Sequence, residues 1–301
     1  MGGNMGSAGL QLVGSAGIPD RFRNAQIDER RRAVRYDGFL GARLRVGTIR
    51  SPHTAGVGDG ILIRPDRAFF AVGDGSDRNP CAVRQVMERF TLMLAEIPDL
   101  DPDRTHRKED LPALRERLSV AANALLRDLC PGDGCTLTGI LLLHTTGGQR
   151  GLLFHTGDSL LYHGDAESGE TRRLTKSNFW FVGRTDRFFQ IDEIPLRNSS
   201  RLLLATDGFS ALFPAGHSRP EEILGELFKG EAVEEIPERL FEGGGSFGGG
   251  RDDAAVLCLT PARRSTAWPP VLLGGTSAAE EGRLQEKTCA AVRTEDDKKT
   301  F

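Results

Sequence analysis

Four aspartates occupy similar positions beside runs of strand-forming residues. Asp59 lies in GVGDGILI and Asp74 in AVGDGS, while Asp207 lies in ATDGF and Asp252 in GRDDAAVLCL. An ionised carboxylate beside buried strand residues is costly unless something pairs with it. If the strand ends meet at one rim of a sheet, the carboxylates repel one another until a divalent cation neutralises them. Oxygen-only ligands suit magnesium or manganese.

The same motifs also have a simpler interpretation. Asp-Gly is a very common turn sequence, so each of the three Asp-Gly pairs, taken alone, is typical of a turn. The shared context of all four aspartates favours a chemical role, although periodicity alone does not show that the strand ends converge. His144, His155 and His163 fall within strand-like runs, and we interpret them as structural.

Short strand-like runs and two helices must position these aspartates. The strand-like runs are 60–63, 68–72, 136–143, 151–155, 159–163, 187–191, 201–206 and 254–259. One helix opens at Asn79-Pro80 and the next near Asp110, each with an apolar stripe at helical spacing. Shorter helices are expected at 220–228 and 233–241. Strands, two adjacent helices and then more strands predict a sheet sandwich flanked by helical layers.

The composition is that of an ordinary globular protein. The chain has 301 residues, of which 39% are hydrophobic and 27% charged, and its net charge is -3. Neither a nucleic-acid partner nor a membrane partner is therefore indicated, and no run of ~18 apolar residues predicts a spanning helix. The N-terminus fits neither a signal peptide nor a myristoylation site, and the five cysteines fit no zinc pattern. We expect a cytoplasmic protein of undetermined oligomeric state.

The patterned region suggests one domain, with boundaries at 41–261. Residues 1–40 are expected to form an N-terminal extension. Residues 262–301 mix Pro, Gly and charge with little periodicity, so we expect a disordered C-terminal tail.

Six motifs occur in an order that resembles a known family. AVGDGS, GCTLTGILLL, FHTGDSLLYHGD, RRLTKSN, RLLLATDGFSALF and RDDAAVLCL follow one another over about residues 45–260. This order resembles the metal-dependent serine/threonine protein phosphatases of type 2C, the PPM family. The resemblance implies an α+β fold, a four-layer α-β-β-α sandwich with two central antiparallel β-sheets flanked by helices. It also implies two Mn²⁺ or Mg²⁺ ions in a cleft at one edge.

The resemblance also assigns roles to the acidic positions. Asp74 would bridge both metals, and Gly75 would offer its backbone carbonyl to one of them. Asp207 and Asp252 would complete the shell of the other metal. Asp59 would hold metal-bound water.

Some positions depart from the family pattern. Gly58 stands where Glu or Gln usually precedes the acid, and Ser76 stands where eukaryotic members carry a His. Arg50 is the best match to the arginine that binds substrate phosphate, but it lies nine residues before Asp59, so a solvated arginine is the alternative. Asp133 is the candidate for a third metal, with a turn as its alternative.

Two functions follow as hypotheses. The first is a bacterial phosphoprotein phosphatase that hydrolyses phosphoserine and phosphothreonine through water activated by a binuclear metal centre. Its partners would be phosphorylated proteins, the targets of a Ser/Thr kinase. The second is a catalytically weak, phosphatase-like regulatory or phosphoprotein-binding module, suggested by Gly58, Ser76 and the long gap after Arg50. Metal binding separates the two, because the second hypothesis predicts little of it.

Overall fold

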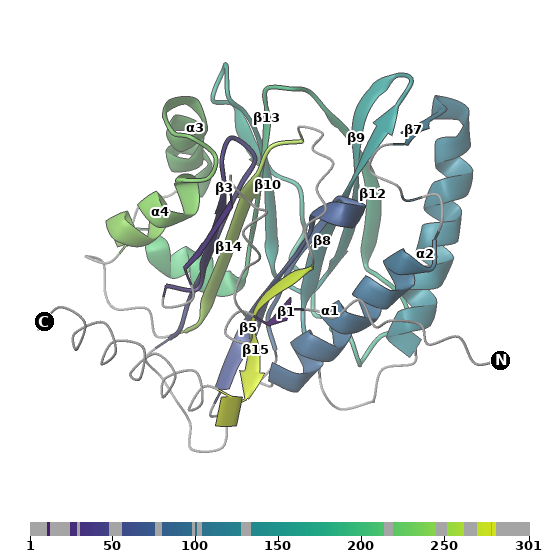
Figure 1. Cartoon of the computed structure of the whole chain (residues 1–301), viewed down its shortest axis with the longest axis horizontal. Helices are drawn as coiled ribbons and strands as arrows, with labels where there is room; N and C mark the ends of the chain where they lie inside the picture. The colour runs from purple at the N-terminus through teal and green to yellow at the C-terminus, as the bar shows by residue number, and fades with distance from the viewer. Residues whose placement is uncertain are drawn as a thin grey trace, which may run out of the picture.

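The computed structural model of the chain contains two β-sheets packed face to face between layers of helices (Figure 1). The structure describes residues 11–12, 25–28, 31–47, 56–75, 80–97, 100, 104–127, 134–213, 219–244, 252–261, 270–277 and 279–280. This architecture is the four-layer α+β sandwich that the sequence predicts.

The first sheet has eight strands among the described residues. Their order is β1–β15–β5–β6–β8–β9–β12, with β7 beside β8. All pairings are antiparallel except β1 with β15 and β7 with β8. The bounds are β1 Gln11–Leu12, β5 Gly56–Arg64, β6 Phe69–Gly73, β7 Thr105–His106, β8 Leu137–Thr145, β9 Gly148–Thr156, β12 Gln190–Leu196 and β15 Val271–Ser277.

The second sheet has seven strands in the same described ranges, in the order β11–β10–β13–β14–β4–β3–β2. Every neighbouring pair is antiparallel. The bounds are β2 Ala25–Asp28, β3 Ala33–Tyr36, β4 Leu40–Arg45, β10 Leu160–Asp165, β11 Thr171–Arg173, β13 Ser200–Ala205 and β14 Ala254–Leu259.

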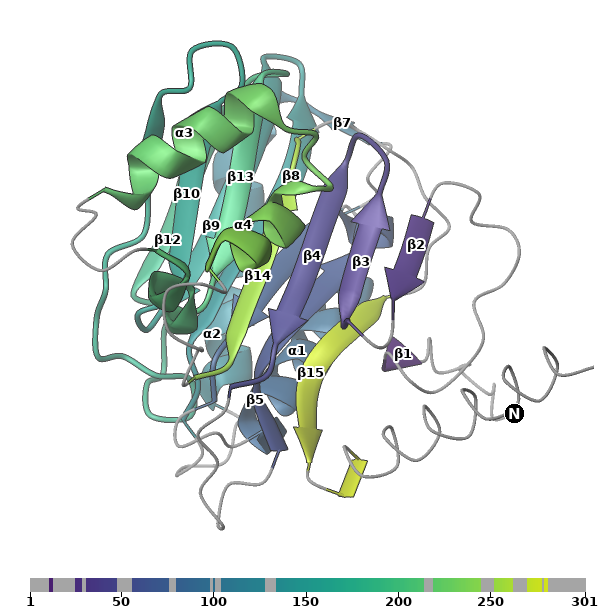
Figure 2. The ribbon, with the colours of Figure 1, turned by 90° about the vertical axis from the view of Figure 1, so that its left-hand side faces the viewer.

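Among the described residues, four α-helices cover the outer faces of the two sheets. α1 (Pro80–Ala95) and α2 (Leu111–Arg127) lie on the first sheet, and α3 (Pro220–Gly230) and α4 (Ile236–Gly244) lie on the second, as Figure 2 shows for the latter pair. The apolar stripe expected on α1 is buried against the sheet. In the described part of the chain, no helix is both long and apolar enough to span a bilayer.

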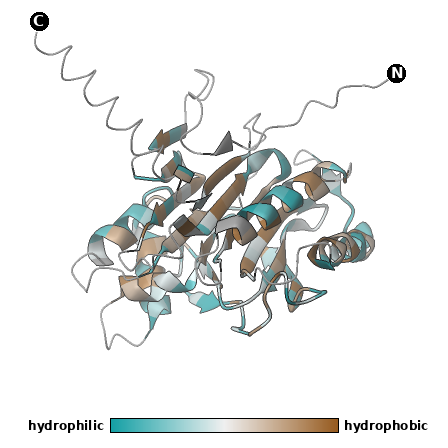
Figure 3. Ribbon diagram, turned by 90° about the horizontal axis from the view of Figure 1, so that it is seen from below, coloured by the Kyte–Doolittle hydropathy of each residue, from teal (hydrophilic) through white to brown (hydrophobic). Residues whose placement is uncertain are grey.

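Strand alternation divides the core into three layers, because successive side chains point to opposite faces of a sheet. Leu202 and Leu204 of β13 pack between the sheets, whereas Leu203 and Ala205 pack beneath α3 and α4. β6 follows the same rule, so Phe70 faces the second sheet. Figure 3 shows the hydrophobic residues gathered in the strands. Two rigid sheets therefore hold the loops at their ends in fixed relative positions.

The sheets extend past the predicted limits of 41–261. β2 and β3 fall in the expected N-terminal extension, yet they continue the second sheet beyond β4. β15 falls in the expected C-terminal tail, yet it pairs with β5 along its length. Both boundaries are therefore corrected. Pairing with a neighbouring strand stabilises these segments although their own periodicity is weak, so the sequence pattern did not reveal them. β12 also begins later than the run predicted at 187–191.

Candidate metal centre

Strand pairing brings the aspartates of the first sheet together. β5 and β6 are antiparallel with Gly60 opposite Gly73, so Asp59 and Asp74 are the next residues along each strand and lie side by side. Asp59 is only 2% exposed. The two carboxyl groups are close enough to interact directly, and each shifts the pKa of the other. The rim of this sheet therefore carries a carboxyl pair in direct contact.

The second sheet brings its own aspartates to the same rim. Asp207 follows β13 at the start of a 3₁₀ helix, and Asp252 lies just before β14, which pairs with β13. Thr206 links the two sheets, because its Oγ1 donates to Asp59 Oδ2 at 2.6 Å and accepts from the Ala255 amide at 2.9 Å. The structure thus confirms that the strand ends converge.

The electrostatics of the rim reflect this crowding. Burial and the charge of Asp207 raise the pKa of Asp74 to about 7. Burial, and then the charge of Asp74, raise the pKa of Asp59 well above its usual range. Burial also raises the pKa of Asp207, with contributions from Asp158 and Asp252. Burial is the larger cause for all three groups, and the neighbouring carboxylates raise these pKa values further.

Asp158 is a member of the rim that the sequence analysis did not single out. It follows β9 in the motif TGDS, directly after Gly157, whose φ is +101°. Its charge raises the pKa of both Asp74 and Asp207. Its Oδ1 is buried and has no hydrogen-bond partner within the described residues. A Gly-Asp pair directly after a strand is the signal that could have identified it.

Asp253 positions the rim rather than forming part of its surface. It is 2% exposed, and its two oxygens accept from the Gly47 amide at 2.7 Å and the Gly58 amide at 3.0 Å. The Gly58 carbonyl in turn accepts from the Gly75 amide at 3.2 Å. A Cβ at Gly208 would collide with the Asp253 carbonyl, so the backbone after Asp207 needs glycine there.

Two hydroxyl groups orient the loop that carries Asp74. Thr136 Oγ1 accepts from the Asp74 amide at 3.0 Å, and it lies 2.5 Å from Ser159 Oγ. The Thr136 amide donates to the Asp74 carbonyl at 2.8 Å. The next residue, Gly75, forms a β-bridge with Cys135. The backbone at Asp74 and Gly75 is therefore fixed from both sides.

The remaining predicted residues are placed differently. Asp252 lies at the rim but is exposed, and its Oδ1 accepts from the Asp253 amide at 2.9 Å. Arg50, Ser76 and Asp133 lie outside the described residues.

The donors at the rim suit divalent cations. They are carboxylate oxygens from several strands, and the buried Asp158 Oδ1 lacks a hydrogen-bond partner in the described ranges. Within those ranges, no three His, Cys, Asp or Glu side chains already form a closed group around one point. An open rim is compatible with magnesium, which keeps several waters and is held by one or two carboxylates.

Solved structures share this architecture. The Mycobacterium tuberculosis serine/threonine phosphatase PstP/Ppp aligns with a TM-score of 0.52 and 23% identity, over 73% of this chain and 97% of that chain. The S. agalactiae serine/threonine phosphatase aligns with a TM-score of 0.53 and 16% identity, over 74% of this chain and 99% of that chain. The chain has the fold of these phosphatases.

A further neighbour bears on the cofactor. The catalytic domain of PstP was solved in complex with two manganese ions, and it aligns with a TM-score of 0.53 and 23% identity, over 73% of this chain and 96% of that chain. By sequence alone, the chain matches no protein-family model and no curated protein. The similarity therefore lies in the fold, and the fold implied by the PPM resemblance is confirmed.

Proposed function

We propose that this protein is a metal-dependent phosphatase that hydrolyses phosphoserine and phosphothreonine in proteins. The observation that carries the proposal is the acidic rim, where carboxyl groups from both sheets converge in the fold of serine/threonine phosphatases. The rim is formed by Asp59, Asp74, Asp158, Asp207 and Asp252.

The residues at the rim would have different roles. Asp74, the Gly75 carbonyl, Asp207 and Asp252 would hold two Mn²⁺ or Mg²⁺ ions. Bound there, such ions lower the pKa of water and offset charge on a phosphoryl group. Thr206 holds one oxygen of Asp59, so this carboxyl keeps a fixed orientation while it carries or releases a proton. The hydrogen bonds of Thr136 and Asp253 fix the positions of the backbone amides around the rim.

A cysteine nucleophile is not supported at the described part of this rim. Cys135 is the cysteine beside Gly75, and it is fully buried. Burial and the charge of Asp74 raise its pKa far above the usual range of a thiol. Since the thiolate is the reactive form of cysteine, direct attack by water on the phosphoryl group is the better route.

Hydrolysis of p-nitrophenyl phosphate with and without manganese tests the proposal. We expect manganese-dependent turnover in the wild type and a loss of at least about a hundredfold in Asp207→Asn, because one ligand is removed. Asp192→Asn is the matched control, since Asp192 is exposed on β12.

The same assay separates the two hypotheses. Folded wild-type protein without turnover on aryl phosphates or phosphopeptides would contradict the enzyme. Calorimetry with manganese would then show whether the binding-module hypothesis, which expects little heat, describes the protein better.

A further inference from the structure

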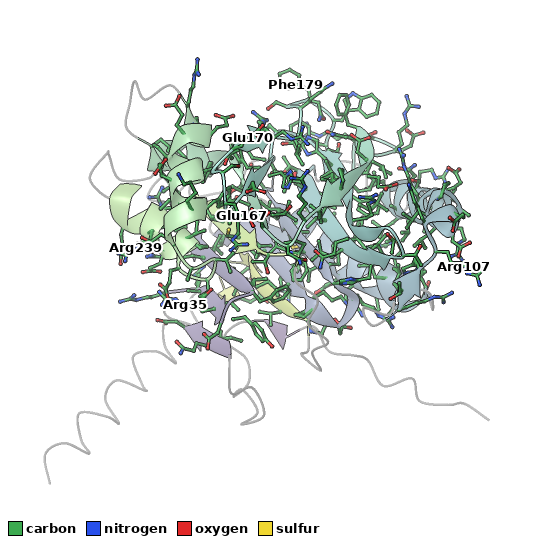
Figure 4. The ribbon with its side chains drawn as sticks, turned by 90° about the horizontal axis from the view of Figure 1, so that it is seen from above. Arg35, Arg107, Glu167, Glu170, Phe179 and Arg239 are labelled. Atoms are coloured by element: carbon green, nitrogen blue, oxygen red, sulfur yellow. The ribbon has the colours of Figure 1, made fainter. Side chains whose placement is uncertain are left out.

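Phe179 is the most exposed large hydrophobic residue in the described part of the chain. Its side chain is 93% exposed, compared with 63% for Leu92 and 42% for Phe189. Figure 4 shows it projecting from the edge of the molecule. A large apolar side chain that stands clear of the surface is typical of an interaction site when other apolar groups surround it.

Hydrogen bonds on either side of Phe179 turn its side chain outward. The Asn178 amide donates to the Gly157 carbonyl at 2.9 Å, and the Gly157 amide donates to Asn178 Oδ1 at 3.0 Å. Thr156 Oγ1 donates to the Trp180 carbonyl at 2.8 Å. Because both neighbours of Phe179 are tied down, its exposure is built into the backbone.

These anchors also place Phe179 beside the acidic rim. Gly157, which bonds twice with Asn178, directly precedes Asp158. Further along the segment, Val182 and Cys135 exchange two backbone hydrogen bonds, of 2.8 and 3.2 Å, and Cys135 bridges to Gly75. The segment therefore borders the rim on the side of Asp74 and Asp158.

Aromatic and cationic groups accompany Phe179 on this segment. Trp180 contacts Phe189 edge to face, with ring centroids 5.6 Å apart, and the Arg187 guanidinium lies 5.3 Å from the centroid of Trp180. Arg184 lies over Phe181 in the same way at 5.8 Å. Arg184 and Arg187 are exposed, so their N–H groups remain accessible.

We propose that Phe179, Trp180, Phe189, Arg184 and Arg187 form a docking surface for the part of a phosphoprotein that flanks its phosphorylated residue. An apolar side chain of the substrate would pack on Phe179, and substrate carboxylates would pair with the two arginines. Charge complementarity selects this occupant, since exposed arginines on the same segment as the exposed rings of Phe179 and Phe189 suit a partner that is both acidic and apolar. The inference rests on the proposed phosphatase function.

The experiment compares two substrates of different size. One is a phosphoserine peptide with acidic and leucine residues beside the phosphate, and the other is p-nitrophenyl phosphate, which has no flanking residues that could pack on Phe179. In Phe179→Ala we expect the ratio of kcat/KM for the peptide to that for the aryl phosphate to fall about tenfold, as for an aromatic anchor. Leu92→Ala, at an exposed position on α1, should keep the ratio within about twofold.

The charge component has its own matched pair of variants. Arg187→Gln should lower the same ratio for the acidic peptide but not for a peptide whose flanks are lysines. Arg107→Gln is the control, because Arg107 is also exposed and is not on the docking segment, as Figure 4 shows. Equal losses on both peptides would overturn the assignment of carboxylates to the arginines.

Other outcomes are distinguishable. An unchanged ratio in Phe179→Ala would overturn the proposal, and a dimer that this variant dissociates would identify a second copy as the occupant. A wild type inactive on both substrates would contradict the proposed function instead. Fluorescence anisotropy of the labelled peptide in EDTA then tests the docking surface independently of catalysis. Weaker peptide binding by Phe179→Ala supports the docking proposal, and equal binding overturns it.

Discussion

Asp74 and Asp165 each lie at the end of a strand, yet their surroundings are opposite. Asp74 follows β6 at the acidic rim, where burial and neighbouring carboxylates raise its pKa to about 7. Asp165 ends β10, at the opposite end of the strand from Asp158. It accepts from the Glu167 and Ser168 amides at 2.9 and 3.0 Å and from Ser199 Oγ at 2.7 Å, and these bonds lower its pKa to about 2.

The difference shows what separates a turn aspartate from a candidate metal ligand. One oxygen of Asp165 accepts from amides of its own turn, which carries Glu167 and Glu170 in Figure 4, and the other accepts from Ser199. Asp74 faces carboxylates from other strands, which, together with burial, disfavour its charged form. Position at a strand end is common to both, and the partners of the carboxyl oxygens decide the role.

The largest expected effect comes from exchanging each aspartate for asparagine. Asp74→Asn should lower manganese-dependent kcat/KM by about a thousandfold, because the ligand proposed to be shared by both ions would lose its charge. Asp165→Asn should change it by less than about twofold. Steady-state kinetics on p-nitrophenyl phosphate measure both. Comparable losses of kcat/KM in the two variants would show that the surroundings of the two carboxyl groups do not determine which one takes part in catalysis.

The histidines extend the comparison to acid stability. His155, near the rim, is buried, with Nδ1 2.8 Å from Thr138 Oγ1 and Nε2 3.0 Å from the Lys176 carbonyl. Burial lowers its pKa to about 4. The His155 imidazole binds a proton near pH 6.5 in the unfolded chain but only near pH 4 in the folded one. The neutral imidazole therefore contributes its full share of the unfolding free energy above pH 6.5, and this share is lost as the pH falls toward 4.

Urea unfolding at pH 7 and pH 4 measures this loss. We expect His155 to account for about 3 kcal/mol of the difference in unfolding free energy. The raised pKa values of Asp59 and Asp74 act in the opposite direction, so the test compares the wild type with His155→Gln, in which the acid-induced loss should be smaller. His163→Gln is the control, because His163 lies on β10 toward Asp165 and its imidazole is only half-buried. Identical pH dependence in the wild type and His155→Gln would contradict the buried neutral imidazole.

Much of the scaffold could be predicted because burial imposes a period on the sequence. The runs that became β6, β8, β13 and β14 are almost wholly apolar, and the stripe of α1 has helical spacing. β15 was missed because its stability comes from pairing with β5, which local sequence does not report. The order of the motifs identified the fold although no family model matches the sequence.

The candidate site was only partly predictable, for a tertiary reason. Asp252 and Asp253 are adjacent, and nothing local tells which one reaches the rim. The structure buries Asp253 against the amides of Gly47 and Gly58 and exposes Asp252. Asp158 was missed because its significance depends on Asp74 and Asp207, which reach it from other strands.

The smallest effect sharpens the comparison through stability. Asp165→Ala removes the acceptor of the Glu167 and Ser168 amides and should lower the unfolding free energy by about 1 kcal/mol, since these groups are exposed enough for water to replace part of the loss. Asp74→Ala, measured without divalent ions, should not lower it, because truncation there relieves repulsion among buried carboxylates. Urea titrations in EDTA measure both variants against the wild type. If the metal-free Asp74→Ala protein were less stable than Asp165→Ala, Asp74 would be making favourable contacts in the folded protein. The contrast between the acidic rim and the turn of Asp165 would then not be electrostatic.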